Sequence, residues 1–216
     1  MEQLLFLGDS ITDCYHSFDT DNLGEGYVRM IAENLGYGFD RVEVLNKGID
    51  GFTLPALLRL WKRDCVELHP DKITILIGIN DVGVIKNTGA DVNFSLEEFK
   101  IGCETLIETI RKTCACPIIL MEPFVFAHPA EYSSWKPLLA EISRILAGVA
   151  NRYGLTWIPL QEDLDRAVER AGYEGITIDG IHLTTEGHQI IAQRWLESTA
   201  QSLSSCNAEI HENHLR

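Results

Sequence analysis

The chain has 216 residues, of which 45% are hydrophobic, so it is long and apolar enough to bury a full core, and its length favours one domain over two. Its 32 acidic residues against 18 Lys and Arg give a formal net charge of -14, which repels nucleic-acid phosphates and anionic lipid surfaces. Neither nucleic acid nor a membrane is therefore expected as a partner.

Short apolar runs alternate with longer segments of helical periodicity, a pattern typical of parallel strands joined by crossover helices. Strands are expected at Leu4–Leu7, Arg41–Leu45, Lys72–Ile77, Pro117–Met121 and Leu155–Pro159. Helices are expected at Gly26–Leu35, Leu54–Leu68, Leu96–Lys112, Trp135–Tyr153, Glu162–Ala171 and Thr185–Ser202. The pattern predicts an α/β fold, a three-layer α/β/α sandwich around a flavodoxin-like parallel sheet of order 2-1-3-4-5.

No internal repeat and no Pro/Gly/Ser-rich linker divides the chain, so residues 1–216 are expected to form a single domain. Residues 203–216 form a polar tail that is either frayed or docked, in the second case against another subunit of a homo-oligomer. The start of the chain has no basic region, and its apolar run Leu4–Leu7 is too short for a signal peptide or a membrane span. A cytoplasmic location is therefore expected.

Cysteines are scattered through a chain that is large enough to fold without disulfides, so free thiols are expected. They are Cys14, Cys65, Cys103, Cys114, Cys116 and Cys206. No Cys or His spacing is typical of a zinc site, and neither a metal nor a cofactor is predicted.

A serine follows directly after the first expected strand, in Gly8-Asp9-Ser10, at the edge where open α/β sheets bind their ligands. A serine hydroxyl becomes a good nucleophile only when a base removes its proton, and that base needs a third group to orient it. The segment Asp179-Gly180-Ile181-His182 supplies both, just before the last helix, for which Thr184 is the expected N-cap. The predicted catalytic residues are therefore Ser10, His182 and Asp179.

Two further strand ends carry hydrogen-bond donors for a developing oxyanion. The second strand leads to Gly48, and the third leads to Asn80. In the order 2-1-3-4-5 these strands flank the first, so the Gly48 N–H, the Asn80 side-chain amide and the Ser10 N–H are expected to point at one spot.

Each of these motifs has a plainer interpretation when it is taken alone. Ser10 is then a turn or cap residue, Gly48 belongs to a tight turn, and Asn80 begins an Asx turn. Asp179 and His182 are then loop residues that bond the backbone. Because all four motifs occur in order, each at a strand end or in the loop before the last helix, their conjunction favours a hydrolase.

The ordered set Gly8-Asp9-Ser10, Gly48, Gly78-x-Asn80-Asp81 and Asp179-x-x-His182 resembles the four blocks of the SGNH (GDSL-like) hydrolase family over nearly the whole chain. The resemblance implies that Ser10 is the nucleophile and that Asp179 and His182 complete its triad. It also implies an oxyanion hole made of the Ser10 and Gly48 backbone N–H groups and the Asn80 side chain, with no cofactor.

Three longer segments resemble a bacterial branch of that family with acetyl xylan esterases and other carbohydrate deacetylases. They are Gly8-Asp9-Ser10-Ile11-Thr12-Asp13, Asn46-Lys47-Gly48-Ile49 and Ile77-Gly78-Ile79-Asn80-Asp81-Val82. This resemblance implies a small ester substrate, such as an acetylated oligosaccharide. The chain departs from the pattern at Ile11, which replaces the leucine of the family's nickname, and at Asp50, where related chains often carry serine. An acidic side chain at that place is expected to alter substrate preference.

Other interpretations stay open. A lysophospholipase or thioesterase would keep the same catalytic residues, and a non-catalytic module would bind a sugar or acyl group in the same crevice. A metal site is less favoured; its ligands would be Asp179, His182, Glu186 and His188.

The sequence allows two interpretations of the aromatic residues near the crevice. Phe124, Phe126 and Trp135 either line an acyl or sugar pocket or pack in the core. Residues 83–94 are expected to form a lid or rim, and Cys14 is expected to be a bystander rather than a reactive thiol.

Overall fold

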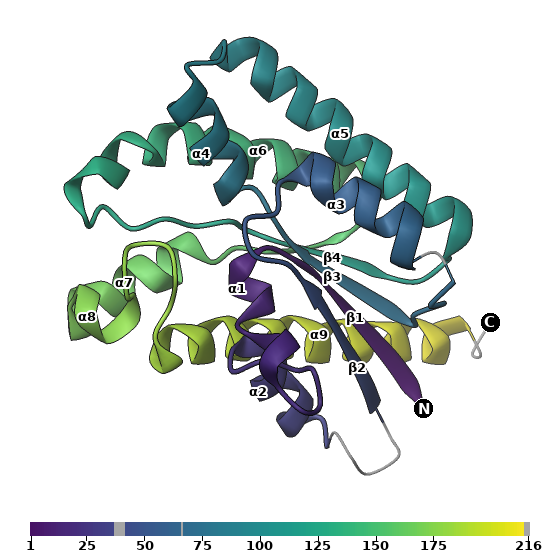
Figure 1. The fold of residues 1–216 in the computed structure, drawn as a ribbon. Coiled ribbons are helices and arrows are strands. Elements are labelled where there is room, and N and C mark those ends of the chain that lie inside the picture. The colour runs from purple at the N-terminus through teal and green to yellow at the C-terminus, as the bar shows by residue number, and fades with distance from the viewer. Residues whose placement is uncertain (37–41, 66, 214–216) are drawn as a thin grey trace.

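The computed structural model describes residues 1–36, 42–65 and 67–213, in which helices cover both faces of one five-stranded sheet (Figure 1). The sheet is parallel throughout, in the order β2-β1-β3-β4-β5. Its strands are β1 Glu2–Gly8, β2 Val42–Gly48, β3 Lys72–Leu76, β4 Ile118–Met121 and β5 Thr156–Ile158. The predicted α/β sandwich and strand order are confirmed, while Arg41, the first residue of one predicted strand, lies outside the described residues.

All six predicted helices are present, together with helices at Ser10–Asp13, Ile79–Thr88 and Tyr173–Ile176 that were not predicted. The helices are α1 Ser10–Asp13, α2 Tyr27–Asn34, α3 Leu54–Leu60, α4 Ile79–Thr88, α5 Val92–Thr113, α6 Lys136–Tyr153, α7 Gln161–Ala171, α8 Tyr173–Ile176 and α9 Thr185–Asn213. A π-helical turn at Trp61–Cys65 continues α3, and the last helix extends beyond Ser202, its predicted end. Within the described chain, no helix combines the length and apolar character that crossing a membrane requires.

Residues 83–94, predicted to form a lid or rim, are mostly helical. Helix α4 runs to Thr88 and ends at Gly89 in the left-handed conformation. Helix α5 begins soon after, where the Asp91 carboxylate accepts the N–H of Phe94. The internal Gly83 suggested a loop, but in the helix it packs closely under the Trp135 ring, which lies 3.2 Å from the position that a Cβ would take there.

The sheet is buried on both faces, as its apolar strands require. In β1, Leu5 and Leu7 pack in the core cluster that contains residues of α3, α5 and α6, while Leu4 and Phe6 pack in the cluster that contains residues of α2 and α9. One hydrogen bond crosses this second core, from Trp195 Nε1 on α9 to Thr74 Oγ1 on β3, at 2.9 Å. The alternation of side chains along each strand thus assigns the helices to two layers.

Two aromatic side chains expected in either the pocket or the core belong to the core. Phe124 and Phe126 are buried among the side chains of the α2 and α9 layer. Trp135 is half-buried and packs edge-on against Tyr132, with ring centroids 4.8 Å apart. The pocket interpretation is therefore wrong for both phenylalanines.

The cysteines do not all behave as expected. Cys114 and Cys116 are joined in a disulfide between α5 and β4, so the prediction of free thiols is wrong for this pair. Cys14 and Cys103 keep free thiols. The side chain of Cys206 lies outside the described part of the chain.

Candidate active site

Ser10 stands where β1 passes directly into a helix. Asp9 caps α1, since its carboxylate accepts the Ile11 N–H at 3.0 Å and its carbonyl accepts the N–H groups of Thr12 and Asp13. Ser10 is the first residue of α1, a position at which a helix leaves the N–H without an intrahelical partner. Helix α1 begins at the carboxyl end of β1 (Figure 1), so the hydroxyl and the N–H of Ser10, its first residue, lie at the carboxyl edge of the sheet.

The structure brings Ser10, His182 and Asp179 together in one chain of hydrogen bonds. His182 Nε2 lies 2.9 Å from Ser10 Oγ, and His182 Nδ1 lies 2.6 Å from Asp179 Oδ2. The second carboxylate oxygen of Asp179 accepts the N–H groups of Ile181 and His182 at 2.9 and 2.8 Å. These distances are typical of strong hydrogen bonds, and the order of groups is that of a serine-hydrolase triad.

The loop that carries Asp179 and His182 is fixed by contacts on both sides. The Thr177 hydroxyl donates to the His182 carbonyl at 2.7 Å and accepts the Gly180 N–H at 2.8 Å. Gly180 has φ +95°, and a Cβ there would lie 2.0 Å from the His128 carbonyl oxygen, so only glycine fits. The sequence offered no signal for Thr177. The predicted cap at Thr184 is confirmed by its hydroxyl, which accepts the Gly187 N–H at 3.3 Å.

The charge of Asp179 is stabilised by the groups around it. Partial burial acts to raise the pKa of Asp179, but the hydrogen bonds from the His182 side chain and from the N–H groups of His182 and Ile181 outweigh it, and the pKa is lowered. Asp179 therefore stays ionised at neutral pH and holds the proton of His182 on Nδ1. This leaves Nε2 free to accept the Ser10 proton.

Two of the three predicted oxyanion donors are free to act as such. The Ser10 N–H has no partner within its helix, as described above. The Asn80 Nδ2 group donates one hydrogen to the Phe52 carbonyl at 3.0 Å and retains a second, because an amide carries two. The Gly48 N–H instead donates to Asn46 Oδ1 at 3.0 Å, so in this structure it already has an acceptor.

Asn46 is a residue of the site that sequence reasoning missed. Its buried side chain donates to the carbonyls of Thr12 and Leu23 at 2.7 and 2.8 Å, besides accepting the Gly48 N–H. A Cβ on Gly48 would lie 2.2 Å from the Asp13 backbone nitrogen, so β2 and α1 approach as closely as backbones can. Asn46 thus joins the end of β2 to the helix that carries the nucleophile. Its only sequence signal was Asn-x-Gly at a strand end.

Two buried carboxyl groups lie behind the site. Burial raises the pKa of Asp9 to about 7, against the opposing hydrogen bond from Ile11. Burial likewise raises the pKa of Asp81 to about 7, although both of its oxygens accept the Leu54 N–H at 3.2 Å. Each group is therefore partly protonated near neutral pH, and the two interact electrostatically.

We expect Asp9→Asn to stabilise the protein in a pH-dependent way. The pKa of Asp9 is about 7 in the folded protein, above the ordinary 3.8, so the folded state binds the Asp9 proton more tightly than the unfolded state does. The wild-type protein therefore loses stability as pH rises from about 4 through 7, because Asp9 must then ionise in a buried place. Asparagine cannot ionise, and its Oδ1 can still accept the Ile11 N–H. The free energy of unfolding of the variant should exceed that of the wild type by up to about 4 kcal/mol at pH 8, at about 1.4 kcal/mol for each pKa unit. Urea unfolding at pH 4 and pH 8 measures this, and a difference that does not change with pH would contradict it.

His188 and Cys14 form a buried contact beside the site, without the features of a metal site. His188 Nδ1 accepts the Tyr27 N–H at 3.2 Å, and its Nε2 lies 3.6 Å from Cys14 Sγ. Burial and the nearby His182 lower the pKa of His188 to about 4, and burial raises the pKa of Cys14. In the part of the chain that the structure describes, no three His, Cys, Asp or Glu residues are grouped to hold a metal. His188 thus accepts the N–H of the first residue of α2, and the raised pKa of Cys14 favours its thiol form.

A cavity of about 370 Å³ opens at the triad. Ser10 and His182 line it, and other residues of its wall are Asp13, Tyr15, Phe18, Asp50 and Ile178. Phe18 is 90% exposed, so the rim is open to solvent and apolar. The cavity has room for a small ester beside the Ser10 hydroxyl.

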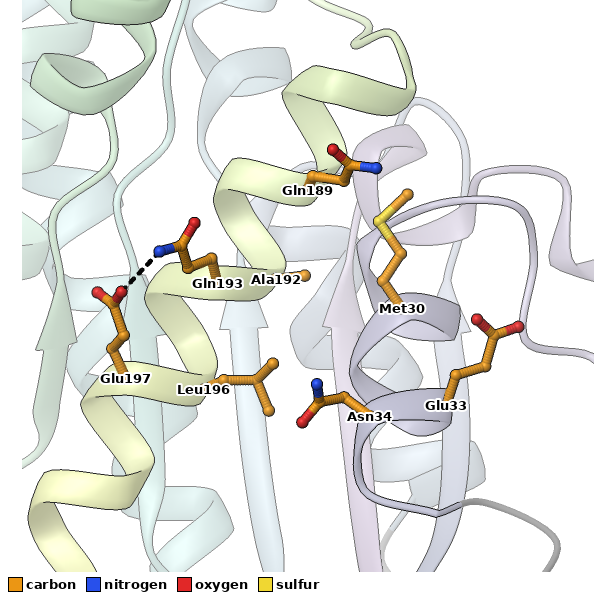
Figure 2. A pocket seen from close by; sticks show the side chains of 8 residues that line it. All are labelled: Met30, Glu33, Asn34, Gln189, Ala192, Gln193, Leu196 and Glu197. Carbon is orange, nitrogen blue, oxygen red and sulfur yellow. Dashed lines mark hydrogen bonds between the residues drawn. The ribbon is translucent and has the colours of Figure 1, made fainter.

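A larger groove of about 550 Å³ lies elsewhere, between α2 and α9 (Figure 2). It is lined by Met30, Glu33, Asn34, Gln189, Ala192, Gln193, Leu196 and Glu197. These residues include no serine, cysteine or histidine, so the groove has no Ser–His or Cys–His pair for acyl transfer. Chemistry rather than size identifies the triad cavity as the candidate active site.

Known proteins resemble this chain over almost its whole length. An acetylxylan esterase from Geobacillus stearothermophilus is 29% identical over 205 residues, which are 90% of this chain and 92% of that protein. A crystal structure of an acetylxylan esterase from that organism has a TM-score of 0.78 at 28% identity, covering 91% and 93% of the two chains. A GDSL-like lipase family protein from Parabacteroides merdae has a TM-score of 0.83 at 29% identity, covering 92% of this chain and 95% of that one.

The family is shown by a direct match. Residues 6–190 match the model of the GDSL-like Lipase/Acylhydrolase family, a span that includes every member of the Ser10, Asp179 and His182 group. The solved structures also include two catalytic mutants of the Geobacillus esterase, in which a serine and an aspartate are replaced by alanine. From its fold, its Ser–His–Asp geometry and this match, the chain belongs to the GDSL-like lipase/acylhydrolase family and is a carboxylic ester hydrolase.

Proposed function

We propose that the protein is a serine esterase that removes O-acetyl groups from carbohydrates through an acyl-enzyme. The observation that carries the proposal is the continuous hydrogen-bond chain from Ser10 Oγ through His182 to Asp179. The alcohol part of the substrate is proposed from the acetylxylan esterase and the acetyl-xylooligosaccharide esterase among the similar proteins.

In the first step, His182 Nε2 takes the proton of Ser10 as Oγ attacks the ester carbonyl carbon. The carbonyl oxygen becomes an oxyanion that accepts hydrogen bonds from the Ser10 N–H and the Asn80 amide. Gly48, predicted as the third donor, would join them by sharing its N–H between Asn46 Oδ1 and the oxyanion. When the tetrahedral intermediate collapses, the carbon–oxygen bond to the alcohol breaks and His182 gives its proton to the leaving oxygen.

In the second step, water takes the place of the alcohol. His182 removes a proton from that water, and the hydroxyl attacks the acyl carbon of the ester on Ser10. Collapse releases the carboxylic acid and returns the proton to Ser10 Oγ. Asp179 remains a carboxylate throughout and stabilises the imidazolium that forms in each step.

Asn80→Ala is expected to lower kcat by about 10²–10³-fold, because it removes a donor that acts on the charge formed in the transition state. The effect should fall mainly on kcat, since the uncharged ground-state carbonyl gains less from the same hydrogen bond. Steady-state kinetics with p-nitrophenyl acetate measure it. Full activity would remove Asn80 from the oxyanion hole and leave it the structural role of bonding the Phe52 carbonyl.

The substrate is tested by following acid release from p-nitrophenyl acetate, butyrate and octanoate and from an acetylated xylo-oligosaccharide, each beside Ser10→Ala. We expect Ser10-dependent turnover that favours the acetyl esters. A preference for octanoate would instead point to a lipid-type acylhydrolase, for which the exposed apolar rim at Tyr15 and Phe18 is the relevant observation. The lack of Ser10-dependent turnover on all four would point to a binding module on the same fold.

A further inference from the structure

The described walls of the triad cavity carry two carboxylate side chains and no Lys or Arg side chain. Asp13 and Asp50 are both among the described residues that line the cavity, and those residues include no Lys or Arg. His188, which also lines it, is uncharged at neutral pH, because burial and the nearby His182 lower its pKa to about 4. A substrate therefore meets a negative potential beside Ser10.

The two carboxylates differ in how they are held. Asp13 is engaged on both oxygens: Oδ1 lies 2.7 Å from His16 Nδ1, and Oδ2 accepts the backbone N–H of Asp50 at 3.1 Å. Asp50 is exposed, and within the described residues no hydrogen bond or ion pair engages its carboxylate. The charge of Asp50 is thus available to a ligand. The backbone N–H of Asp50 donates to Asp13, and this hydrogen bond fixes the position of the residue.

Asp50 also stands close to the reacting groups. It follows Gly48 by two residues, at the end of the strand next to β1, and the backbone of Gly48 contacts that of Asp13 on the helix that begins with Ser10. Burial is the main cause of the raised pKa of Asp9; the charge of Asp50 adds to it, and the nearby His182 acts in the opposite direction. A charged group on the alcohol part of an ester bound at Ser10 would therefore lie within the range of this carboxylate.

The rim offers a second feature that favours cations. Tyr15 and Phe18 line the same cavity and are 69% and 90% exposed, so their ring faces are open to a ligand. Aromatic faces attract ammonium groups through the ring quadrupole and do not attract carboxylates or phosphates. Rings and carboxylates therefore act on a charged substrate in the same direction.

We propose that Asp50 is a specificity-determining residue that makes the site select esters of neutral or cationic alcohols and reject esters of anionic ones. The inference rests on the proposed function, because it concerns the alcohol part of the ester that Ser10 attacks. Esters of acidic sugars and of phospholipids are then excluded as substrates, because their carboxylate or phosphate would face Asp50.

The test uses three acetate esters of nearly the same shape and different charge. They are acetylcholine, 3,3-dimethylbutyl acetate and 4-acetoxy-2,2-dimethylbutanoate, which are cationic, neutral and anionic. Acid release in a pH-stat at low ionic strength gives kcat/KM for each. Because all three carry the same acyl group, the cost of forming the oxyanion near Asp50 is common to them and cancels in the ratios.

We expect kcat/KM to fall in the order cationic, neutral, anionic, with a ratio of about 10-fold or more between the extremes that shrinks as salt screens the charges. Asp50→Asn keeps the shape and the backbone hydrogen bond, and it should lower that ratio about 3- to 10-fold. Asp50→Lys should reverse the order. Glu97→Gln on α5, which removes an exposed charge from a residue that does not line the cavity, serves as the matched control and should leave the ratio as in the wild type.

A ratio that Asp50→Asn leaves within twofold of the wild type, or that Glu97→Gln lowers equally, would overturn the inference. Calorimetric binding of the three esters to Ser10→Ala gives the same ranking without turnover. If the neutral ester shows no Ser10-dependent hydrolysis but the order of affinities for the three esters depends on Asp50, the proposed esterase function is wrong and the selection of ligands by charge is supported. If hydrolysis depends on Ser10 but kcat/KM is the same for all three esters, the proposed esterase function is supported and the inference about Asp50 is wrong.

Discussion

Ser10→Ala is expected to lower kcat for acetate esters by about 10⁵–10⁶-fold, since removal of the nucleophile of a serine-hydrolase triad costs about this much. Without the Ser10 hydroxyl, the acyl-enzyme cannot form. The Ser10 N–H belongs to the backbone and remains, so the variant keeps part of its oxyanion hole and should still bind substrate. Stopped-flow release of p-nitrophenol separates the acylation burst from steady turnover, and both should disappear.

The cavity contains its own control for this experiment. Ser17 lines the same cavity as Ser10 but lies in the short 3₁₀ segment His16–Phe18, away from the His182 contact. Ser17→Ala should therefore retain the burst. If Ser10→Ala kept the burst and Ser17→Ala lost it, the nucleophile would be assigned to the wrong serine. Thermal unfolding of both variants shows that any loss of activity is not a loss of fold.

Asp179→Asn is expected to lower kcat about 10⁴-fold while leaving the loop intact. Asparagine keeps an oxygen for the N–H groups of Ile181 and His182, so the turn that the carboxylate now holds can persist. Its amide then faces His182 Nδ1 and donates to it, which places the imidazole proton on Nε2. In that tautomer His182 cannot accept the proton of Ser10.

The measurement is kcat at saturating acetate ester, together with the imidazole ¹⁵N chemical shifts of His182, which report the tautomer directly. We expect low kcat with the proton on Nε2. Asp165→Asn, on the exposed surface of α7, removes an equal charge from outside the triad and should leave the His182 signals unchanged. A small loss of activity with the proton still on Nδ1 would mean that another group orients His182.

The periodicity of the chain was enough to predict the layers of the fold. Runs such as Leu4–Leu7 are apolar at every position, and only strands buried on both faces require that. Helix α4 was missed because its apolar residues do not form a single stripe and because glycine in its interior is usually a breaker. Packing of Trp135 against Gly83 supplied the tertiary reason for that glycine.

The chain contains a second Asp-x-x-His segment, which shows what sequence spacing leaves undecided. Asp13 and His16 are three residues apart, and His16 Nδ1 lies 2.7 Å from Asp13 Oδ1, much as His182 Nδ1 lies from Asp179. The distance between imidazole and carboxylate is therefore nearly the same in both pairs. Only His182 reaches Ser10 Oγ, because the loop before α9 folds over the carboxyl edge of the sheet.

By itself, the sequence determined the strands and the strand ends that carry Ser10, Gly48 and Asn80, because hydrophobic periodicity and the βα succession are local properties of the chain. Tertiary structure decided what depends on contacts between distant segments. It determined that Asn46 engages the Gly48 N–H, that burial raises the pKa of Asp9 to about 7, and that the charge of Asp50 stands free at the cavity. Burial and hydrogen-bond partners arise only when segments far apart in the chain meet, so residue spacing alone could not reveal them.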